Sequence, residues 1–111
     1  MDLDMSSFGS AVASARKKMG WSQKELAAKI IKEEDQAPIT PQYLNDIEHN
    51  RRSPTSNHLV KQFARVLDID ADVLFAIIGM LPEKERKLVS KSNPAAVGEA
   101  LIAFRRKLGG T

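Results

Sequence analysis

The middle of the chain reads Ile39-Thr-Pro-Gln-Tyr-Leu-Asn-Asp-Ile-Glu-His-Asn-Arg-Arg-Ser-Pro54. Thr40 followed by Pro41 signals the start of a helix, because a threonine hydroxyl can cap free amides and proline loses nothing at the first helical position. We expect this helix to run from Thr40 to residue 48 or 49. Leu44 and Ile47, three residues apart, then face the core. The polar side chains that face outward are Gln42, Asn45 and Asp46.

Similar signals mark helices on both sides of this stretch. Apolar residues at helical spacing predict a helix over residues 6–19 that stops at Gly20. Ser22-Gln-Lys-Glu25 has the spacing of a capping box, so a second helix begins there. We expect further helices from Thr55 to Leu67, from Asp70 to about Gly79, from Pro82 to about Lys91 and from Asn93 to Leu108. No alternating run suits a half-buried strand, and the predicted fold class is all-α.

Composition and charge narrow the possible functions. The chain has 111 residues, a formal net charge of +3 and 42% hydrophobic residues, as expected for a soluble globular protein. The basic excess lies in residues 6–67, with ten basic and six acidic side chains, which favours a polyanionic partner for this part. There is no cysteine, so disulfides, thiolate metal sites and cysteine nucleophiles are excluded. The longest apolar run, Val73 to Leu81, is too short to cross a bilayer, and we expect a cytoplasmic protein without a membrane partner.

Three segments together resemble a known family. They are Gly20-Trp-Ser-Gln-Lys-Glu-Leu-Ala-Ala28, the stretch 39–54 quoted above, and Leu59-Val-Lys-Gln-Phe-Ala-Arg-Val-Leu67. Their pattern resembles the Cro and phage-repressor (xenobiotic-response-element, XRE) family of helix-turn-helix transcriptional regulators, over about residues 8–78. The resemblance implies a five-helix lambda-repressor-like DNA-binding domain, which we place at 6–79, followed by two short C-terminal helices in 80–111.

The resemblance also implies roles for individual residues. The side chains expected to contact bases are Gln42, Asn45, Asp46 and Tyr43. Glutamine and asparagine can pair with adenine, and aspartate can accept from the amino group of cytosine or instead orient a neighbouring side chain. The residues expected to contact the DNA backbone are Gln23, Lys24, Thr40, Asn50, Arg51, Arg52 and Ser53. Arg16 and Glu48 match a buried pair that positions the recognition helix.

One segment departs from the family pattern. Between Ile30 and Ile39 the family usually has a single turn residue, whereas this chain has eight. We expect Lys32-Glu-Glu-Asp-Gln-Ala-Pro38 to lengthen the second helix by about a turn and to add a loop. The role of this 31–38 insertion stays open.

The resulting prediction is a repressor that binds a double-stranded DNA operator as a homodimer, with activation as another possible output. The alternative is a protein-binding adaptor or antitoxin whose partner binds residues 80–111. Within that segment Val97, Leu101, Phe104 and Leu108 form a stripe that either packs in the core or joins two chains. An enzyme fits poorly, because there is no phosphate-binding glycine loop and His49 and His58 lack metal-ligand spacing. We expect no cofactor and no metal, and an exposed His58.

Overall fold

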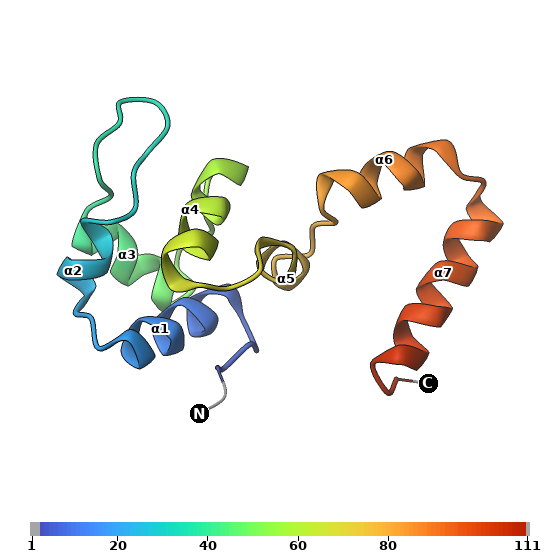
Figure 1. Ribbon diagram of the computed structural model, residues 1–111, viewed down its shortest axis with the longest axis horizontal. Coiled ribbons are helices and arrows are strands. Elements are labelled where there is room, and N and C mark those ends of the chain that lie inside the picture. The colour runs from blue at the N-terminus through green and yellow to red at the C-terminus, as the bar shows by residue number, and fades with distance from the viewer. Residues whose placement is uncertain (1–2, 111) are drawn as a thin grey trace. The chain divides into compact units, whose positions relative to one another are not determined.

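The computed structural model describes residues 3–110, which form seven helices and no strand beyond one isolated bridge (Figure 1). The predicted all-α fold class is confirmed. Contacts divide the chain into two compact units, the first ending at Met80 and the second beginning at Leu81. The first unit contains α1 (Phe8–Met19), α2 (Gln23–Ala27), α3 (Pro41–Glu48), α4 (Asn57–Leu67) and α5 (Ala71–Ile77). The second contains α6 (Glu83–Lys91) and α7 (Pro94–Lys107).

Most helix starts follow their sequence signals. The Ser22 hydroxyl accepts from the Glu25 amide and the Glu25 carboxylate accepts from the Ser22 amide, which completes the capping box. The Thr40 hydroxyl caps α3 by accepting from the Tyr43 amide, with Pro41 as the first helical residue. Gly20 ends α1 in the left-handed region at φ 78°.

Two starts differ from the expectation. The first helix, expected from residue 6, begins at Phe8 with Ser7 as its cap, and α4 is capped by Ser56 rather than Thr55. Ser56 has the extended backbone of an N-cap, and its hydroxyl accepts from the Leu59 amide at 3.2 Å. Thr55 and Ser56 are both capping residues, so composition alone did not distinguish them.

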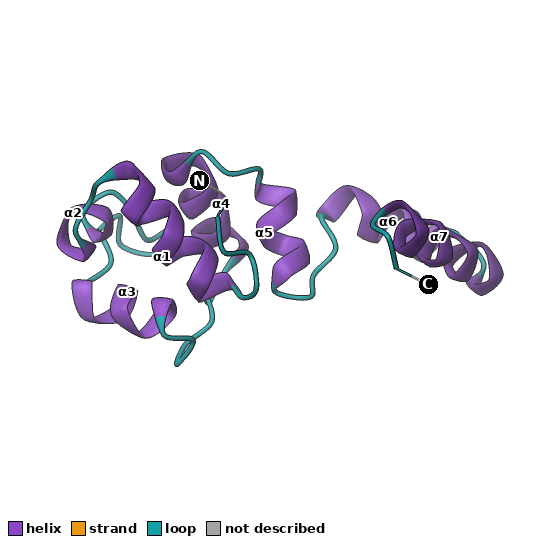
Figure 2. Ribbon diagram, turned by 90° about the horizontal axis from the view of Figure 1, so that it is seen from below, coloured by secondary structure: helices purple, strands orange, loops and turns teal. Residues whose placement is uncertain are grey.

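The first unit has one hydrophobic core to which all five of its helices contribute. Phe8 of α1 meets Phe63 of α4 edge to face, with ring centroids 5.6 Å apart and an interplanar angle of 85°. Side chains that are completely excluded from solvent are Ala11, Val12, Leu26, Ile30, Leu44, Ile47, Phe63 and Leu74. This core holds α3 against α1 and α2 (Figure 2).

The 31–38 insertion does not lengthen the second helix, and that expectation is wrong. The second helix ends at Ala27, and the chain forms a hairpin closed by an antiparallel bridge between Ile31 and Pro38. The Ile39 amide donates to the Ile30 carbonyl at 2.9 Å and the Lys32 amide to the Ala37 carbonyl at 2.8 Å. The backbone groups therefore pair across the loop instead of along a helix.

The hairpin is anchored on α4. The Ile31 amide donates to Gln62 Oε1 at 3.1 Å, and His58 Nε2 lies 2.9 Å from the Ile31 carbonyl oxygen. Because a carbonyl can only accept, His58 must carry its hydrogen on Nε2. His58 is only partly exposed, so the expectation of a freely exposed residue is wrong. In Figure 1 this hairpin is the long loop between α2 and α3.

The second unit leaves its apolar side chains in solvent. Neither α6 nor α7 contains a buried residue. Leu88, Phe104 and Leu108 are 60%, 58% and 71% exposed. Of the stripe expected on α7, Leu101, Phe104 and Leu108 are exposed and Val97 is partly buried. Over residues 3–110, every helix is too short or too polar to span a membrane.

Candidate nucleic-acid interface

Helix α3 has one buried face and one outward face. Leu44 and Ile47 are fully buried, whereas Gln42 is exposed and Asn45 and Asp46 are partly exposed. This is the division that the spacing of the apolar residues predicts. The outward face thus presents amide and carboxylate groups on a helix that the core holds in place.

An ion pair fixes the C-terminal end of α3 to α1. Arg16 donates from Nε to Glu48 Oε2 at 2.7 Å and from Nη2 to Glu48 Oε1 at 3.0 Å. Its third nitrogen, Nη1, donates to the Trp21 carbonyl at 2.8 Å. The two side chains are 12% and 3% exposed, and such a bidentate pair has little freedom to move.

A row of hydrogen bonds connects this pair to the outward face of α3. Gln23 Nε2 donates to Glu48 Oε1 at 3.0 Å, and Asn45 Nδ2 donates to Gln23 Oε1 at 3.3 Å. Gln23 is the first residue of α2, so these bonds also join α2 to α3. Gln23 was expected to contact a phosphate, and here its amide group faces α3 with one hydrogen left for another acceptor.

The row continues through the loop that follows α3. Arg51 Nη2 donates to Asn45 Oδ1 at 2.6 Å, and Arg51 Nε donates to Asp46 Oδ1 at 3.1 Å. Gln42 Nε2 also donates to Asp46 Oδ1, at 3.1 Å. Three of the residues expected to contact bases are therefore joined in one network with Arg51.

Asp46 is the acceptor at the centre of this network. Its second oxygen lies 3.5 Å from Arg52 Nε. The hydrogen bond from Arg51, together with the one from Gln42 and the positive charges of Arg51 and Arg52, lowers the pKa of the Asp46 carboxyl from its ordinary value. Asp46 thus stays ionised and ties Gln42 and two arginines together.

Tyr43 differs from the other residues expected to contact bases. Its ring packs against the hydrophobic core, and its hydroxyl is buried without a hydrogen-bond partner among the described residues. The Arg52 guanidinium lies 5.8 Å from the ring centroid, within range of a cation–π contact. Tyr43 therefore offers a packing surface for Arg52.

Asn50 closes α3 onto the start of α1. Its backbone has φ 60°, and its amide donates to the Ile47 carbonyl at 3.0 Å. Its side chain accepts from the Gly9 amide at 3.1 Å and donates to Ser7 Oγ at 3.0 Å. Asn50 was expected to contact the DNA backbone, but its backbone amide and its side chain both form hydrogen bonds within the protein. Sequence reasoning did not identify this clasp, although asparagine just after a helix commonly adopts the left-handed conformation.

The other residues expected to contact the DNA backbone lie at the surface. Lys24, Arg52 and Ser53 are exposed. Thr40 is exposed as well, but its hydroxyl accepts from the Tyr43 amide at 3.0 Å as a helix cap. Lys24 lies in the first turn of α2, before α3 in the chain, and the 51–53 loop follows α3.

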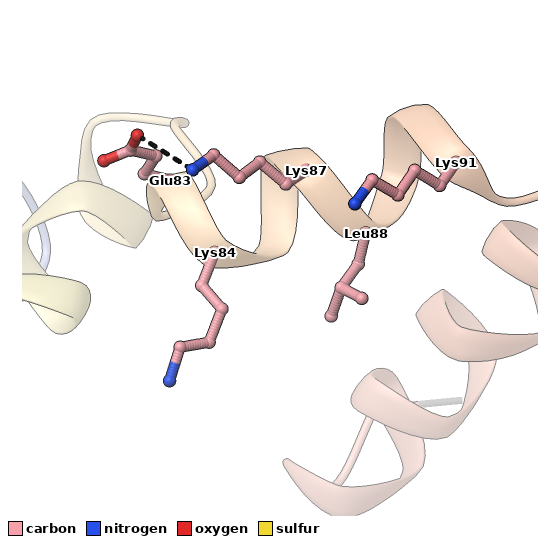
Figure 3. A pocket seen from close by; sticks show the side chains of 5 residues that line it. All are labelled: Glu83, Lys84, Lys87, Leu88 and Lys91. Carbon is pink, nitrogen blue, oxygen red and sulfur yellow. Dashed lines mark ion pairs between the residues drawn. The ribbon is translucent and has the colours of Figure 1, made fainter.

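The surface of residues 3–110 includes two hollows of about 370 Å³ each. One lies at the Arg16–Glu48 pair and also involves Lys17 and His49. The other is lined by α6 alone, where Lys87 Nζ lies 3.5 Å from Glu83 Oε1 (Figure 3). A hollow with a single helix as its wall is an open surface. Among residues 3–110 no group of three or more histidine, cysteine or carboxylate side chains is arranged to hold a metal ion.

Known proteins share the helix-turn-helix arrangement of this chain. Residues 12–74 match the family model described as helix-turn-helix. A solved chain from the complex of the SinR protein and the SinI protein is similar, with 24% sequence identity, a TM-score of 0.51, and coverage of 90% of this chain and 96% of that chain. At that identity the likeness shows the fold. A search of curated proteins finds no match. The chain belongs to the helix-turn-helix family of DNA-binding proteins, in its Cro and phage-repressor (XRE) branch.

Proposed function

We propose that this protein is a sequence-specific regulator that inserts α3 into the major groove of double-stranded DNA and represses transcription. The observation that carries the proposal is the outward face of α3, where Gln42, Asn45 and Asp46 are accessible and linked to Arg51. An α-helix fits the major groove, and amide side chains can pair with its base edges. A binding function of this kind requires no catalysis.

Within this proposal Gln42 and Asn45 read bases. The Gln42 amide keeps its oxygen and one hydrogen, the pattern needed to bind N6 and N7 of adenine. Asn45 keeps one amide hydrogen for a base, because its oxygen accepts from Arg51 and its other hydrogen is donated to Gln23. Asp46 has its carboxylate occupied by Gln42 and the arginines, which favours an orienting role over a contact to cytosine. Tyr43 supports Arg52 from the core side.

The surrounding residues hold the DNA backbone. Lys24 and Arg52 supply positive charge, and Ser53 and the remaining amide hydrogen of Gln23 supply neutral donors. Thr40 and Asn50 contribute by placing the two ends of α3, because their side chains are engaged within the protein. These contacts provide affinity and salt dependence without selecting a sequence.

A homodimer fits a partly palindromic operator. Two copies of α3 would enter successive major grooves on one face of the duplex, with half-sites about 10 base pairs apart. The exposed apolar side chains of α6 and α7 offer a surface through which a second copy can bind. Repression follows most simply, since a small dimer on an operator blocks access to a promoter.

A second candidate function is that of a protein-binding adaptor. The exposed apolar side chains of α7 support it, as does the occurrence of the similar chain in a complex of the SinR and SinI proteins. In this case α6 and α7 would bind another protein, and α3 would not recognise a specific DNA sequence.

Selection of bound sequences from a random duplex pool, followed by competition at physiological salt, separates the two. A regulator prefers its selected sequence over random competitor by roughly 10³-fold or more, with two related half-sites. Enrichment of no sequence by the full-length protein would reject the regulator and leave the adaptor.

A further inference from the structure

The backbone after α3 folds back over the last turn of that helix. Asn50 makes the reversal at φ 60°. The Arg51 amide then donates to the Asp46 carbonyl at 2.8 Å, and the Arg52 amide donates to the same oxygen at 3.3 Å. The backbone of Arg51 therefore lies beside the outward face of α3, and the chain does not leave the helix at this point.

One edge of the Arg51 guanidinium is bound to α3. Nε donates to Asp46 Oδ1 and Nη2 to Asn45 Oδ1, at 3.1 and 2.6 Å. These two nitrogens share one edge of the planar group, which carries five donors in a fixed arrangement. The edge formed by Nη1 and the second hydrogen of Nη2 has no acceptor among residues 3–110, and the side chain is 55% exposed. Two parallel donors are thus held ready for a bidentate acceptor.

The charge of Arg51 is shared with a carboxylate. Asp46 lies within 3.1 Å of Arg51 and 3.5 Å of Arg52. Asp46 is hydrogen-bonded to Arg51 and lies farther from Arg52, so it offsets the charge of Arg51 more than that of Arg52. Arg51 therefore brings less net charge than Arg52 to a phosphate, whose binding depends mainly on charge. Its free donors still suit a neutral acceptor, and guanine presents O6 and N7 side by side in the major groove.

We propose that Arg51 reads a guanine in the major groove, and that Asp46 is the positioning residue that holds it beside Asn45. This inference rests on the proposed function, since it requires α3 to enter the groove. It assigns Arg51 to base recognition, whereas its place in the loop after the helix implied a contact to the DNA backbone. Its neighbour Arg52, directed toward the Tyr43 ring, keeps the backbone role.

The test measures dissociation constants for the selected duplex and for all single base-pair substitutions of one half-site. The proteins are the full-length chain, Arg51→Ala, Arg51→Lys and the matched control Arg52→Ala, each checked by thermal denaturation. The wild type is expected to bind roughly 5- to 150-fold more weakly when one particular G·C pair is replaced. In Arg51→Ala this preference disappears and the other positions keep theirs.

The other two variants and a modified base distinguish guanine recognition from phosphate binding. Arg51→Lys keeps the charge but loses the fork, so it should also lose the guanine preference. Arg52→Ala should weaken all sequences alike and reduce the salt slope by about one unit. A 7-deazaguanine, which lacks the N7 acceptor, at the chosen position should weaken binding of the wild type and not of Arg51→Ala.

Two outcomes overturn the inference and differ from each other. If Arg51→Ala weakens every duplex equally and flattens the salt dependence, Arg51 binds a phosphate and the proposed function stands. If the wild type prefers no sequence, the inference and the proposed function fail together.

Discussion

Glu48 in α3 accepts two hydrogen bonds from Arg16 in α1, and only 3% of the Glu48 side chain is exposed. Arg16 and Gln23 both use this carboxylate as an acceptor. This pair holds the end of α3 against α1, and the hydrogen bonds through Gln23 to Asn45 connect it to the outward residues.

We expect Glu48→Ala to lower the free energy of unfolding by about 3–5 kcal/mol, because Arg16 would remain buried without a counter-ion. Urea denaturation followed by circular dichroism measures the change. The double variant Arg16→Met with Glu48→Leu should recover most of the loss, since a buried ion pair can be replaced by apolar side chains of similar volume. A loss below about 1 kcal/mol in the single variant would contradict a buried pair.

The close approach of α1 and α3 predicts a second effect on stability. A Cβ atom at Gly9 would collide with the backbone oxygens of Ile47 and Glu48. We expect Gly9→Ala to destabilise the first unit by about 1–3 kcal/mol, as measured by thermal denaturation. Gly98, inside α7, has open space around it, and Gly98→Ala is the matched control that should leave the transition unchanged or raise helix content. Equal effects of the two substitutions would argue against the close contact.

The Asp46 carboxyl provides a pH-dependent prediction. Hydrogen bonding from Arg51 lowers its pKa below the ordinary value of 3.8. A carboxyl with a lowered pKa in the folded state stabilises the protein above the unfolded-state pKa, and this contribution is lost as pH falls through the folded-state pKa. Carbon-13 NMR should give a titration midpoint for Asp46 below 3.8.

Arg51→Ala should raise that midpoint toward the ordinary value. Asp35 is an internal control, because its pKa is lowered by the Ala37 amide and by Lys32 and should not respond to Arg51. A wild-type midpoint for Asp46 at or above the ordinary value would be inconsistent with the network.

The hairpin predicts a local change in hydrogen exchange. Gln62→Ala removes the acceptor of the Ile31 amide, so exchange of this amide should accelerate roughly 2- to 12-fold, the equivalent of one ordinary hydrogen bond. The Lys32 amide, which donates to Ala37 within the hairpin, serves as the control. Unchanged exchange at Ile31 would mean that α4 does not anchor the hairpin.

The sequence was sufficient where structure depends on neighbours in the chain. A capping side chain accepts a hydrogen bond from a backbone amide only two or three residues later. The caps Ser22, Thr40, Asp70 and Asn93 could therefore be identified from local spacing. The two faces of α3 follow from the period of the helix in the same way.

The sequence was insufficient where a segment depends on distant residues. The course of the 31–38 hairpin depends on His58 and Gln62 in α4, so its composition alone suggested more helix. Likewise, Asn50 pairs with Ser7 and Gly9, more than 40 residues away. The contact of Arg51 with Asn45 and Asp46 required the reversal at Asn50 and was not predictable from charge.

Whether α3 reads DNA is tested most directly with Gln42→Ala. The measurement compares the base-pair preferences of this variant with those of the wild type. Gln42 is exposed, and its one hydrogen bond joins it to Asp46, so its removal should not unfold the protein. We expect the variant to bind the selected duplex about 1–3 kcal/mol more weakly and to lose its preference at a single base pair per half-site. A variant that retains every preference of the wild type would contradict the assignment of α3 as the reading element.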